Sequence, residues 1–248
     1  MSKVKGIIED YKLLLRSIPG IITMFFCISI VLMNVLANKV ILNLPFVAGD
    51  GGLVLSWIVF LCMDTVTKRY GAKAANRLNV VGLIVSLIFV GIFSLVSAIQ
   101  IEVGCEHVDY SAFNSVFGAT WFVVLGSSIA FITSGVVNNL LNEAVGKLFV
   151  KNPDGKLAFY CRSYVSTFIG QCVDNFLFAF IVFVIFAPIY WGFSLTIFQC
   201  IGSAILGGIT ELLMEVIFSP IGYKISQSWK RDNVGAEYLK KHSEEVVA

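Results

Sequence analysis

The sequence predicts an all-α, polytopic membrane protein with six transmembrane helices and both termini in the cytoplasm. Composition is the first reason, since hydrophobic residues make up 57% of the chain and charged residues 14%, against roughly 45–50% and 25% in soluble domains. The second reason is that long apolar runs alternate with short charged segments. The third is that the Lys and Arg residues gather in only four of those segments.

Six apolar runs are expected to cross a hydrocarbon core of about 30 Å as helices that rise about 1.5 Å per residue. Their expected bounds are 19–42, 52–67, 79–99, 117–142, 163–190 and 194–220. The second run is short, and we count it because the charges on its two sides require a crossing.

The four cationic clusters set the expected topology. They hold seventeen of the eighteen Lys and Arg residues and leave only Lys39 outside. Their members are Lys3, Lys5, Lys12 and Arg16; Lys68, Arg69, Lys73 and Arg77; Lys147, Lys151, Lys156 and Arg162; and Lys224, Lys230, Arg231, Lys240 and Lys241. Because Lys and Arg concentrate in cytoplasmic loops, we expect these segments inside and the remaining loops outside.

Both ends of the chain differ from the membrane domain, which we expect to span 19–225. Residues 1–18 predict an amphipathic helix along the inner leaflet, because apolar residues recur at helical spacing opposite charged ones. No small-x-small cleavage site precedes Asn38, so we expect the first apolar run to remain as a span and not to act as a signal peptide. Residues 226–248 predict a polar cytoplasmic tail.

Several classes of protein are disfavoured. The six cysteines have no paired spacing, and the two histidines lie outside the runs, so we expect no zinc site and no disulfide framework. The sequence has no HExxH, GxGD or Walker A motif. A membrane enzyme acting on a lipid or isoprenoid would need clustered acids with a metal or phosphate motif, to which only residues 138–143 come close. These absences lower the expectation of an enzyme, although a mechanism that uses carboxylates alone stays open. We expect no cofactor, no metal and no nucleic-acid partner.

Polar residues within the runs are the candidate site, because an Asp, Lys or Arg at the centre of a span costs roughly 2.5–3.5 kcal/mol on an insertion scale. Each needs a partner or a cavity. The candidate substrate-binding residues are Asn34, Asn38, Asp64, Asn138, Gln171, Asp174, Asn175, Glu211 and Glu215.

Asp174 is the strongest of these candidates. It lies roughly 18 Å along the helix from Arg162, near the middle of the membrane, and Gln171 and Asn175 share its face. We interpret Asp174 as a ligand contact. The alternative is a core carboxylate that pairs with a neighbouring helix.

Three other acids are open to two interpretations. Glu211 and Glu215 lie one turn apart, where two ionised carboxylates would repel each other, and this spacing makes both of them candidates for proton coupling. Alternatively, Glu215 reaches water or a base at the inner leaflet. Asp64 is either a ligand contact or the partner of Lys68 in an i,i+4 ion pair.

Three stretches resemble the queuosine precursor transporter family, also called the vitamin uptake transporter (VUT) family. They are CMDTVTKRYG from Cys62 to Gly71 followed by Ala74, Arg162 with Ser166 through Phe178, and Glu215 with Pro220. Asn34, Asn38 and Lys39 at the end of the first span fit as well. The resemblance covers essentially the whole membrane core in the right order.

The resemblance implies a six-helix importer of deazaguanine bases such as queuine, in the inner (cytoplasmic) membrane, serving tRNA modification salvage. A guanine-like edge presents an N–H beside an amino group, which Asp174 could accept as a bidentate pair while Gln171 or Asn175 meets the carbonyl. A second carboxylate, from Glu211, Glu215 or Asp64, would hold an aminomethyl cation. We expect alternating access around this pocket, driven by protons, by the substrate gradient or by trapping in tRNA.

Two departures from the family leave the substrate open among queuine, a smaller precursor and a related purine. Asn138 stands where the family often has Asp, and Thr67-Lys68 where it often has Asn-Glu. An alternative is a substrate-binding component of an ATPase-coupled vitamin or purine uptake system, which such six-helix proteins resemble in fold. Those components usually carry an Ala-x-x-x-Ala pattern on the first span, and residues 19–42 lack it. Small residues on the sixth span, Ser203, Ala204, Gly207 and Gly208, leave a homodimer open.

Overall fold

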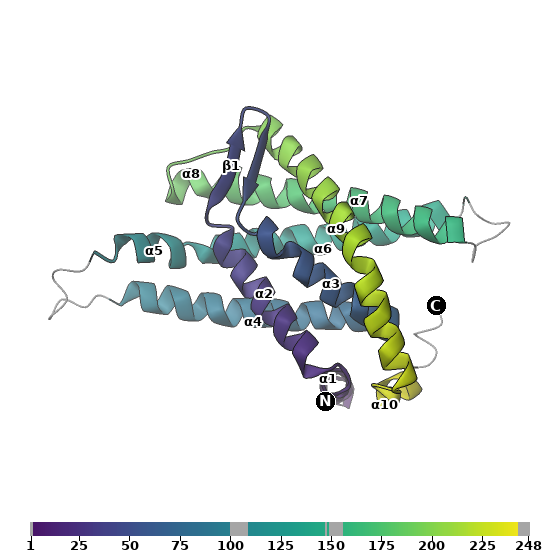
Figure 1. The fold of residues 1–248 in the computed structure, drawn as a ribbon. Coiled ribbons are helices and arrows are strands. Elements are labelled where there is room, and N and C mark those ends of the chain that lie inside the picture. The colour runs from purple at the N-terminus through teal and green to yellow at the C-terminus, as the bar shows by residue number, and fades with distance from the viewer. Residues whose placement is uncertain (1, 100–108, 147, 149–155, 243–248) are drawn as a thin grey trace. The chain divides into compact units, whose positions relative to one another are not determined.

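The computed structural model describes residues 2–99, 109–146, 148 and 156–242. Helices dominate it, as predicted (Figure 1). The elements in chain order are α1 (Ser2–Ser17), α2 (Gly20–Leu36), β1 (Val40–Leu44), β2 (Val47–Asp50), α3 (Leu53–Tyr70), α4 (Ala72–Ala98), α5 (Ser111–Phe117), α6 (Thr120–Gly146), α7 (Lys156–Ala179), the π-helix η2 (Phe180–Phe186), α8 (Ala187–Tyr190), α9 (Ile197–Arg231) and α10 (Ala236–Lys241).

Among the described residues, four helical segments are long and apolar enough to cross a membrane: Lys73–Ala98, Ser111–Asn138, Thr167–Tyr190 and Ile197–Arg231. The pair α1 and α2 adds a fifth if it counts as one span, although the two helices meet at an angle of 106°. The segment Leu53–Thr67 is apolar but shorter. The protein is therefore a multi-pass, mainly helical membrane protein, with four or five spans by this measure.

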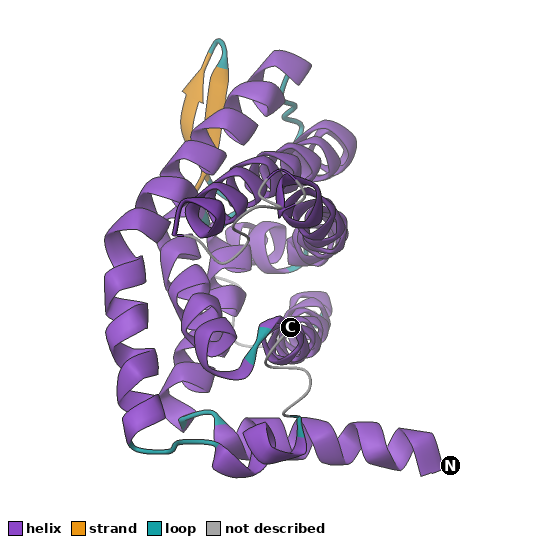
Figure 2. Ribbon diagram, turned by 90° about the vertical axis from the view of Figure 1, so that its right-hand side faces the viewer, coloured by secondary structure: helices purple, strands orange, loops and turns teal. Residues whose placement is uncertain are grey.

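A β-hairpin interrupts the expected all-α pattern (Figure 2). The first apolar run was expected to be helical to residue 42, but α2 ends at Leu36. The amide of Asn38 explains the stop, because its Nδ2 donates to the carbonyl oxygens of Val35 at 2.9 Å and Asn34 at 3.3 Å. Carbonyls at a helix C-terminus have no partner within the helix, so this side chain supplies one. The antiparallel hairpin then pairs Val40 with Asp50 and Leu44 with Val47.

The chain divides into two compact units. The first contains Met1–Leu32, Leu55–Ser86 and Met214–Ala248, and the second contains Met33–Val54 and Leu87–Leu213. Four helices, α2, α3, α4 and α9, contribute residues to both units. Seven of the nine predicted site residues lie in the second unit.

In the first unit, α1 packs against α10 through its polar face. Asp10 of α1 forms ion pairs with Lys241 at 2.7 Å and Arg77 at 3.6 Å. The hydrogen bond from Lys241 lowers the pKa of the Asp10 carboxyl. In the same unit, the buried Tyr70 donates a hydrogen bond to the Ser17 carbonyl at 2.6 Å. The amphipathic pattern of residues 1–18 thus gives a helix, and its polar side is partly used to hold the C-terminal segment.

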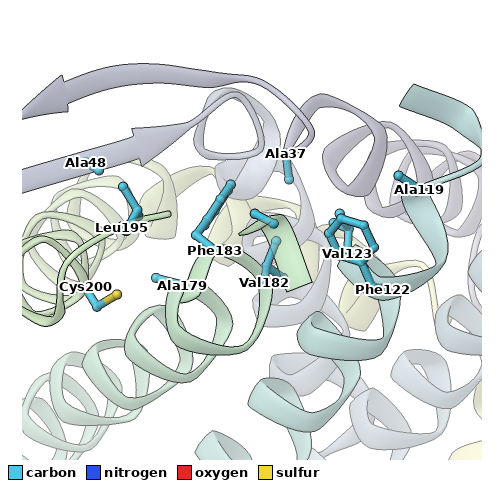
Figure 3. Packing of buried hydrophobic residues seen from close by; sticks show 11 residues of the cluster. Ala37, Ala48, Ala119, Phe122, Val123, Ala179, Val182, Phe183, Leu195 and Cys200 are labelled. Carbon is cyan, nitrogen blue, oxygen red and sulfur yellow. The ribbon is translucent and has the colours of Figure 1, made fainter. Parts of the chain in front are cut away.

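The core of the second unit is formed by α6, η2, the hairpin and the start of α9 (Figure 3). Phe122 of α6 is fully buried and stacks on Phe186 and Tyr190, with ring centroids 5.5 and 5.1 Å apart. After α8 the chain reverses, and the Leu195 amide donates to the Phe183 carbonyl at 3.2 Å. This core fixes the position of the hairpin and of the first turns of α9.

The hairpin is also hydrogen-bonded to α9. Ser203 donates to the Ala48 carbonyl, and Gln199 Nε2 donates to Asn43 Oδ1 at 2.7 Å and to the Leu44 carbonyl at 3.0 Å. At Gly202 the backbones come so close that an added Cβ would overlap the carbonyl oxygen of Phe46. The hairpin is therefore a docked part of the second unit.

Candidate functional site

The interface between α6 and α7 holds Asp174, the strongest candidate from the sequence. These two helices pack side by side. Ser134 of α6 donates its Oγ–H to Asp174 Oδ1 at 2.8 Å. One turn away on both helices, a Cβ added to Gly170 would lie 3.1 Å from the Cβ of Asn138. Residues four apart share a helix face, so Ser134 and Asn138 together face Gly170 and Asp174.

A second polar contact connects α7 to α9. Asn175 Nδ2 donates to the Gln171 carbonyl at 2.9 Å, and its amide also hydrogen-bonds the carboxyl of Glu211. Glu211 is only 7% exposed, and its carboxyl lies near enough to Asp174 for the two charges to interact. Three of the predicted side chains, Asp174, Asn175 and Glu211, are thus brought together, and the backbone carbonyl of Gln171 adjoins them.

Two oxygen atoms in this cluster are buried without a hydrogen-bond partner in the described part of the chain. They are Glu211 Oε2 and Asn138 Oδ1. A buried polar atom without a partner carries a desolvation penalty of about 1–3 kcal/mol, and such atoms are rare in folded proteins. Their position beside Asp174 is the pattern that a polar ligand would complete.

Glycines on α9 allow the close approach to α7. A Cβ at Gly207 would lie 2.5 Å from Asn175 Cγ, and one at Gly208 would lie 2.7 Å from Cys172 Sγ. The small-residue face that left a homodimer open is therefore covered within the second unit, by α7 and, at Ser203, by the hairpin. This face gives no support to a dimer.

Gly207→Ala is expected to separate α9 from α7 and to displace Asn175. Overpacking of this kind costs about 1–3 kcal/mol, which corresponds to a decrease in Tm of roughly 2–10 °C for a chain of this size. The measurement is the thermal unfolding of the detergent-purified protein. Gly135→Ala is the matched control, because no atom lies within 4 Å of its added Cβ. An equal Tm for the two variants would contradict the packing described here.

Asp50, the last residue of β2, is a residue that the sequence analysis missed. With Asn175 and Ser203 it lines a small cavity between the hairpin, α7 and α9. Its Oδ1 accepts the Gly52 amide at 2.8 Å. Burial raises the pKa of Asp50 to about 6, against an opposing effect of that hydrogen bond. Asp50 is thus a third carboxylate, after Asp174 and Glu211, and it lines the same cavity as Asn175.

Comparison with known proteins identifies the family of the chain. The profile of a family described as "putative vitamin uptake transporter" matches residues 50–225, well over half of the chain. The chain belongs to this family. The resemblance noted in the sequence is thereby confirmed, and the family is described as one of transporters, in agreement with the expectation of a transporter and not an enzyme.

A curated relative has a more specific name than the family. The "probable queuosine precursor transporter" of Bacillus subtilis (strain 168) is 26% identical over 132 residues, which cover 53% of this chain and 55% of that protein. The chain thus aligns with about half the length of this curated relative. No solved structure matches the chain significantly.

The family match includes Asp50 and seven of the predicted site residues, but it begins after Asn34 and Asn38. The structure also places this pair apart from Asp174. Asn38 Nδ2 donates to Thr120 Oγ1 at 3.2 Å, and Thr120 precedes Ser134 by fourteen residues, or about 21 Å of helix. Asn34 is buried and supplies its carbonyl to Asn38. In this structure both residues make hydrogen bonds at the C-terminal end of α2.

Asp64 and Glu215 belong to α3 and α9 of the transporter, and their side chains lie outside the described residues. Their predicted roles as ligand and proton-coupling groups therefore stay predictions. Within the described residues, no group of three or more His, Cys, Asp or Glu side chains could hold a metal ion.

Proposed function

We propose that this transporter imports queuosine precursors or salvage bases of the deazaguanine type across the inner membrane. The observation that carries the proposal is the pair of neighbouring carboxyls, Asp174 and Glu211, held with Asn175 inside apolar helices. Ionisable residues inside a membrane are expensive and mark substrate or proton paths. The name of the Bacillus subtilis relative, a probable queuosine precursor transporter, supports the choice of substrate.

The chemistry of the cluster suits a guanine-like edge. In our proposal, the ring N–H and the exocyclic amine of the base donate to Asp174, in the bidentate geometry that a carboxylate accepts. Gln171 provides an amide that can meet the base carbonyl. Glu211 Oε2 and Asn138 Oδ1, the two unpartnered oxygens, gain partners when the base is bound.

The proposed transport cycle is alternating access, with six spans, both termini in the cytoplasm and Glu211 and Glu215 as proton-coupling groups. The cavity beside Asp50, with a volume of about 20 Å³, is too small for a two-ring base, since ligand pockets usually measure about 300–1,000 Å³. The helices must therefore move to admit the substrate. The close glycine contacts between α7 and α9 make that interface the part that has to open.

The test is thermal stabilisation of the detergent-purified protein, alone and without an ATPase partner, across queuine, its deazaguanine precursors, guanine and riboflavin. Selective stabilisation by a deazaguanine is the expected result, because a ligand that binds only the folded state raises Tm. Stabilisation by riboflavin instead would contradict the proposal. No response to any compound would favour the alternative, a substrate-binding component that needs its ATPase module.

A further inference from the structure

Asp50 lines a cavity whose size is unusual for a transport site. The cavity leaves about 20 Å³ for the centre of a water-sized group, which is room for about one water molecule. Apolar residues, among them Phe178, Phe183 and Leu195, form most of its wall. An ammonium group is close to a water molecule in size, so the cavity has room for one.

The hydrogen bonds already made leave three acceptors in the wall. Asp50 Oδ1 accepts the Gly52 amide, and the Asp50 carboxylate also accepts its own backbone amide. A carboxylate has about four lone-pair sites, so acceptor capacity remains. The two hydrogens of Asn175 Nδ2 are used by Gln171 and Glu211, so the amide oxygen remains. Ser203 gives its hydroxyl hydrogen to Ala48 and keeps its lone pairs. A primary ammonium has three N–H donors and no acceptor.

Charge points in the same direction. Among the described residues that line the cavity, Asp50 is the only ionisable one, so an ionised Asp50 contributes a charge of −1. Apolar walls strengthen the attraction for a cation, because a low dielectric weakens screening. Aromatic rings such as Phe178 and Phe183 also tolerate a cation near their faces.

We propose that this cavity binds a protonated primary amine carried by the transported base, with Asp50 as its counter-ion. This inference rests on the proposed function and adds to it the residue that selects aminomethyl-bearing bases over neutral analogues. It replaces the sequence-based expectation that Glu211, Glu215 or Asp64 holds the cation. Asn175 then connects the two parts of the site, since it contacts both the amine cavity and Glu211.

The test compares the wild type with Asp50→Asn in two titrations, one with 7-aminomethyl-7-deazaguanine and one with its neutral 7-cyano analogue. Asn preserves the acceptor for the Gly52 amide, so the hairpin is expected to keep its structure. Removing the charge is expected to weaken binding of the aminomethyl base roughly 10- to 100-fold, the range for a hydrogen bond to a charged group. Binding of the cyano base is expected to change less than about 3-fold.

Asp109→Asn is the matched control. Asp109 makes the same kind of turn, with Oδ1 accepting the Ser111 amide at 2.8 Å, but it is exposed and outside the cavity. This variant is expected to bind both bases like the wild type. Equal losses for the two bases in Asp50→Asn, or no loss in either, would overturn the inference and leave the proposed function standing. Failure of the wild type to bind either base would overturn both.

A sodium ion is a competing occupant of such a cavity, and the same titrations in sodium-free choline buffer distinguish it. Amine recognition predicts the same affinity with and without sodium. If both bases required sodium and Asp50→Asn removed that requirement, the cavity would be an ion site and the inference would be wrong.

pH provides an independent arm of the test. A carboxyl whose pKa is raised to about 6 is mostly ionised at pH 7.5 and mostly protonated at pH 5, whereas a primary amine stays protonated over this range. The affinity for the aminomethyl base is therefore expected to fall as the pH decreases, and the affinity for the cyano base less so. Because Glu211 of α9 is linked to the cavity through Asn175, the Asp50→Asn variant is titrated in parallel. A pH dependence that persisted unchanged in this variant would contradict the role of Asp50.

Discussion

Replacing Asp174 by Asn is expected to weaken deazaguanine binding by about 100-fold or more. Two hydrogen bonds to a charged acceptor contribute about 1.5–3 kcal/mol each, and every 1.4 kcal/mol is a factor of about ten in affinity. The amide also turns one acceptor into a donor, which would face the N–H groups of the base. Isothermal titration with the base that gives the largest thermal stabilisation measures the loss.

Folding of this variant is expected to be intact. Asn is nearly the same size as Asp and can still accept the hydrogen bond from Ser134. It also removes a charge that is costly inside the membrane and that lies near Glu211. The Tm of the ligand-free variant should therefore equal or exceed that of the wild type.

Ser134→Ala is the companion variant, because it removes the hydrogen bond to Asp174 and leaves the carboxylate in place. The expected loss of affinity is at most about 10-fold. If Asp174→Asn bound the base as well as the wild type did, Asp174 would be a structural carboxylate, which is the alternative left open by the sequence. A loss as large in Ser134→Ala would mean that the position of the carboxylate matters more than its charge.

The sequence analysis could single out candidate site residues inside apolar helices. Polar residues stand out in apolar runs because a polar group in hydrocarbon needs a hydrogen-bond or ion-pair partner. Asp174, Asn175 and Glu211 are such residues. Helical spacing then predicted Gln171 and Asn175 on one face; in the structure Asn175 donates to the backbone carbonyl of Gln171. Such inferences depend only on periodicity along one helix, so they need no tertiary information.

The sequence did not reveal Asp50, and the reason is physical. Residues 40–42 continue the apolar run of α2, and a short apolar segment does not distinguish a strand from a helix by periodicity. Asp50 follows in a Gly-rich segment where a carboxylate looks solvated. The available signal was Pro45 in the turn together with β-branched residues on both sides, a pattern typical of a hairpin. Its place in the cavity that Asn175 also lines depends on the docking of the hairpin, which no local pattern contains.

The grouping of helices was also beyond the sequence. Asn34 and Asn38 were assigned to the same pocket as Asp174 because all are polar residues within spans. The contact of Asn38 with Thr120, far along α6 from Ser134, depends on which turns of α2 and α6 meet. In the same way, the small residues at 203–208 fit a dimer interface and an internal contact equally well, and the structure uses them internally.

Gly202→Ala is expected to undock the hairpin from α9 and to remove selective binding of the aminomethyl base. The added methyl group would overlap the Phe46 carbonyl, and an atom of the backbone cannot move away without moving the hairpin. The overpacking cost of about 1–3 kcal/mol adds to the loss of hydrogen bonds from Gln199 and Ser203. The expected decrease in Tm is therefore larger than for Gly207→Ala.

Limited chymotrypsin digestion measures the undocking directly. Phe46 at the hairpin tip is 76% exposed, and its backbone is held by the contact with α9, so cleavage after Phe46 should become faster in Gly202→Ala. Ser203→Ala removes one hydrogen bond without any overlap and should fall between this variant and the wild type. If Gly202→Ala were cleaved at the wild-type rate and kept its preference for the aminomethyl base, the hairpin would not be what positions Asp50. Asp50 is part of β2, so it lines the cavity only while the hairpin is docked. The preference for the charged base and the docking of the hairpin should therefore be lost together.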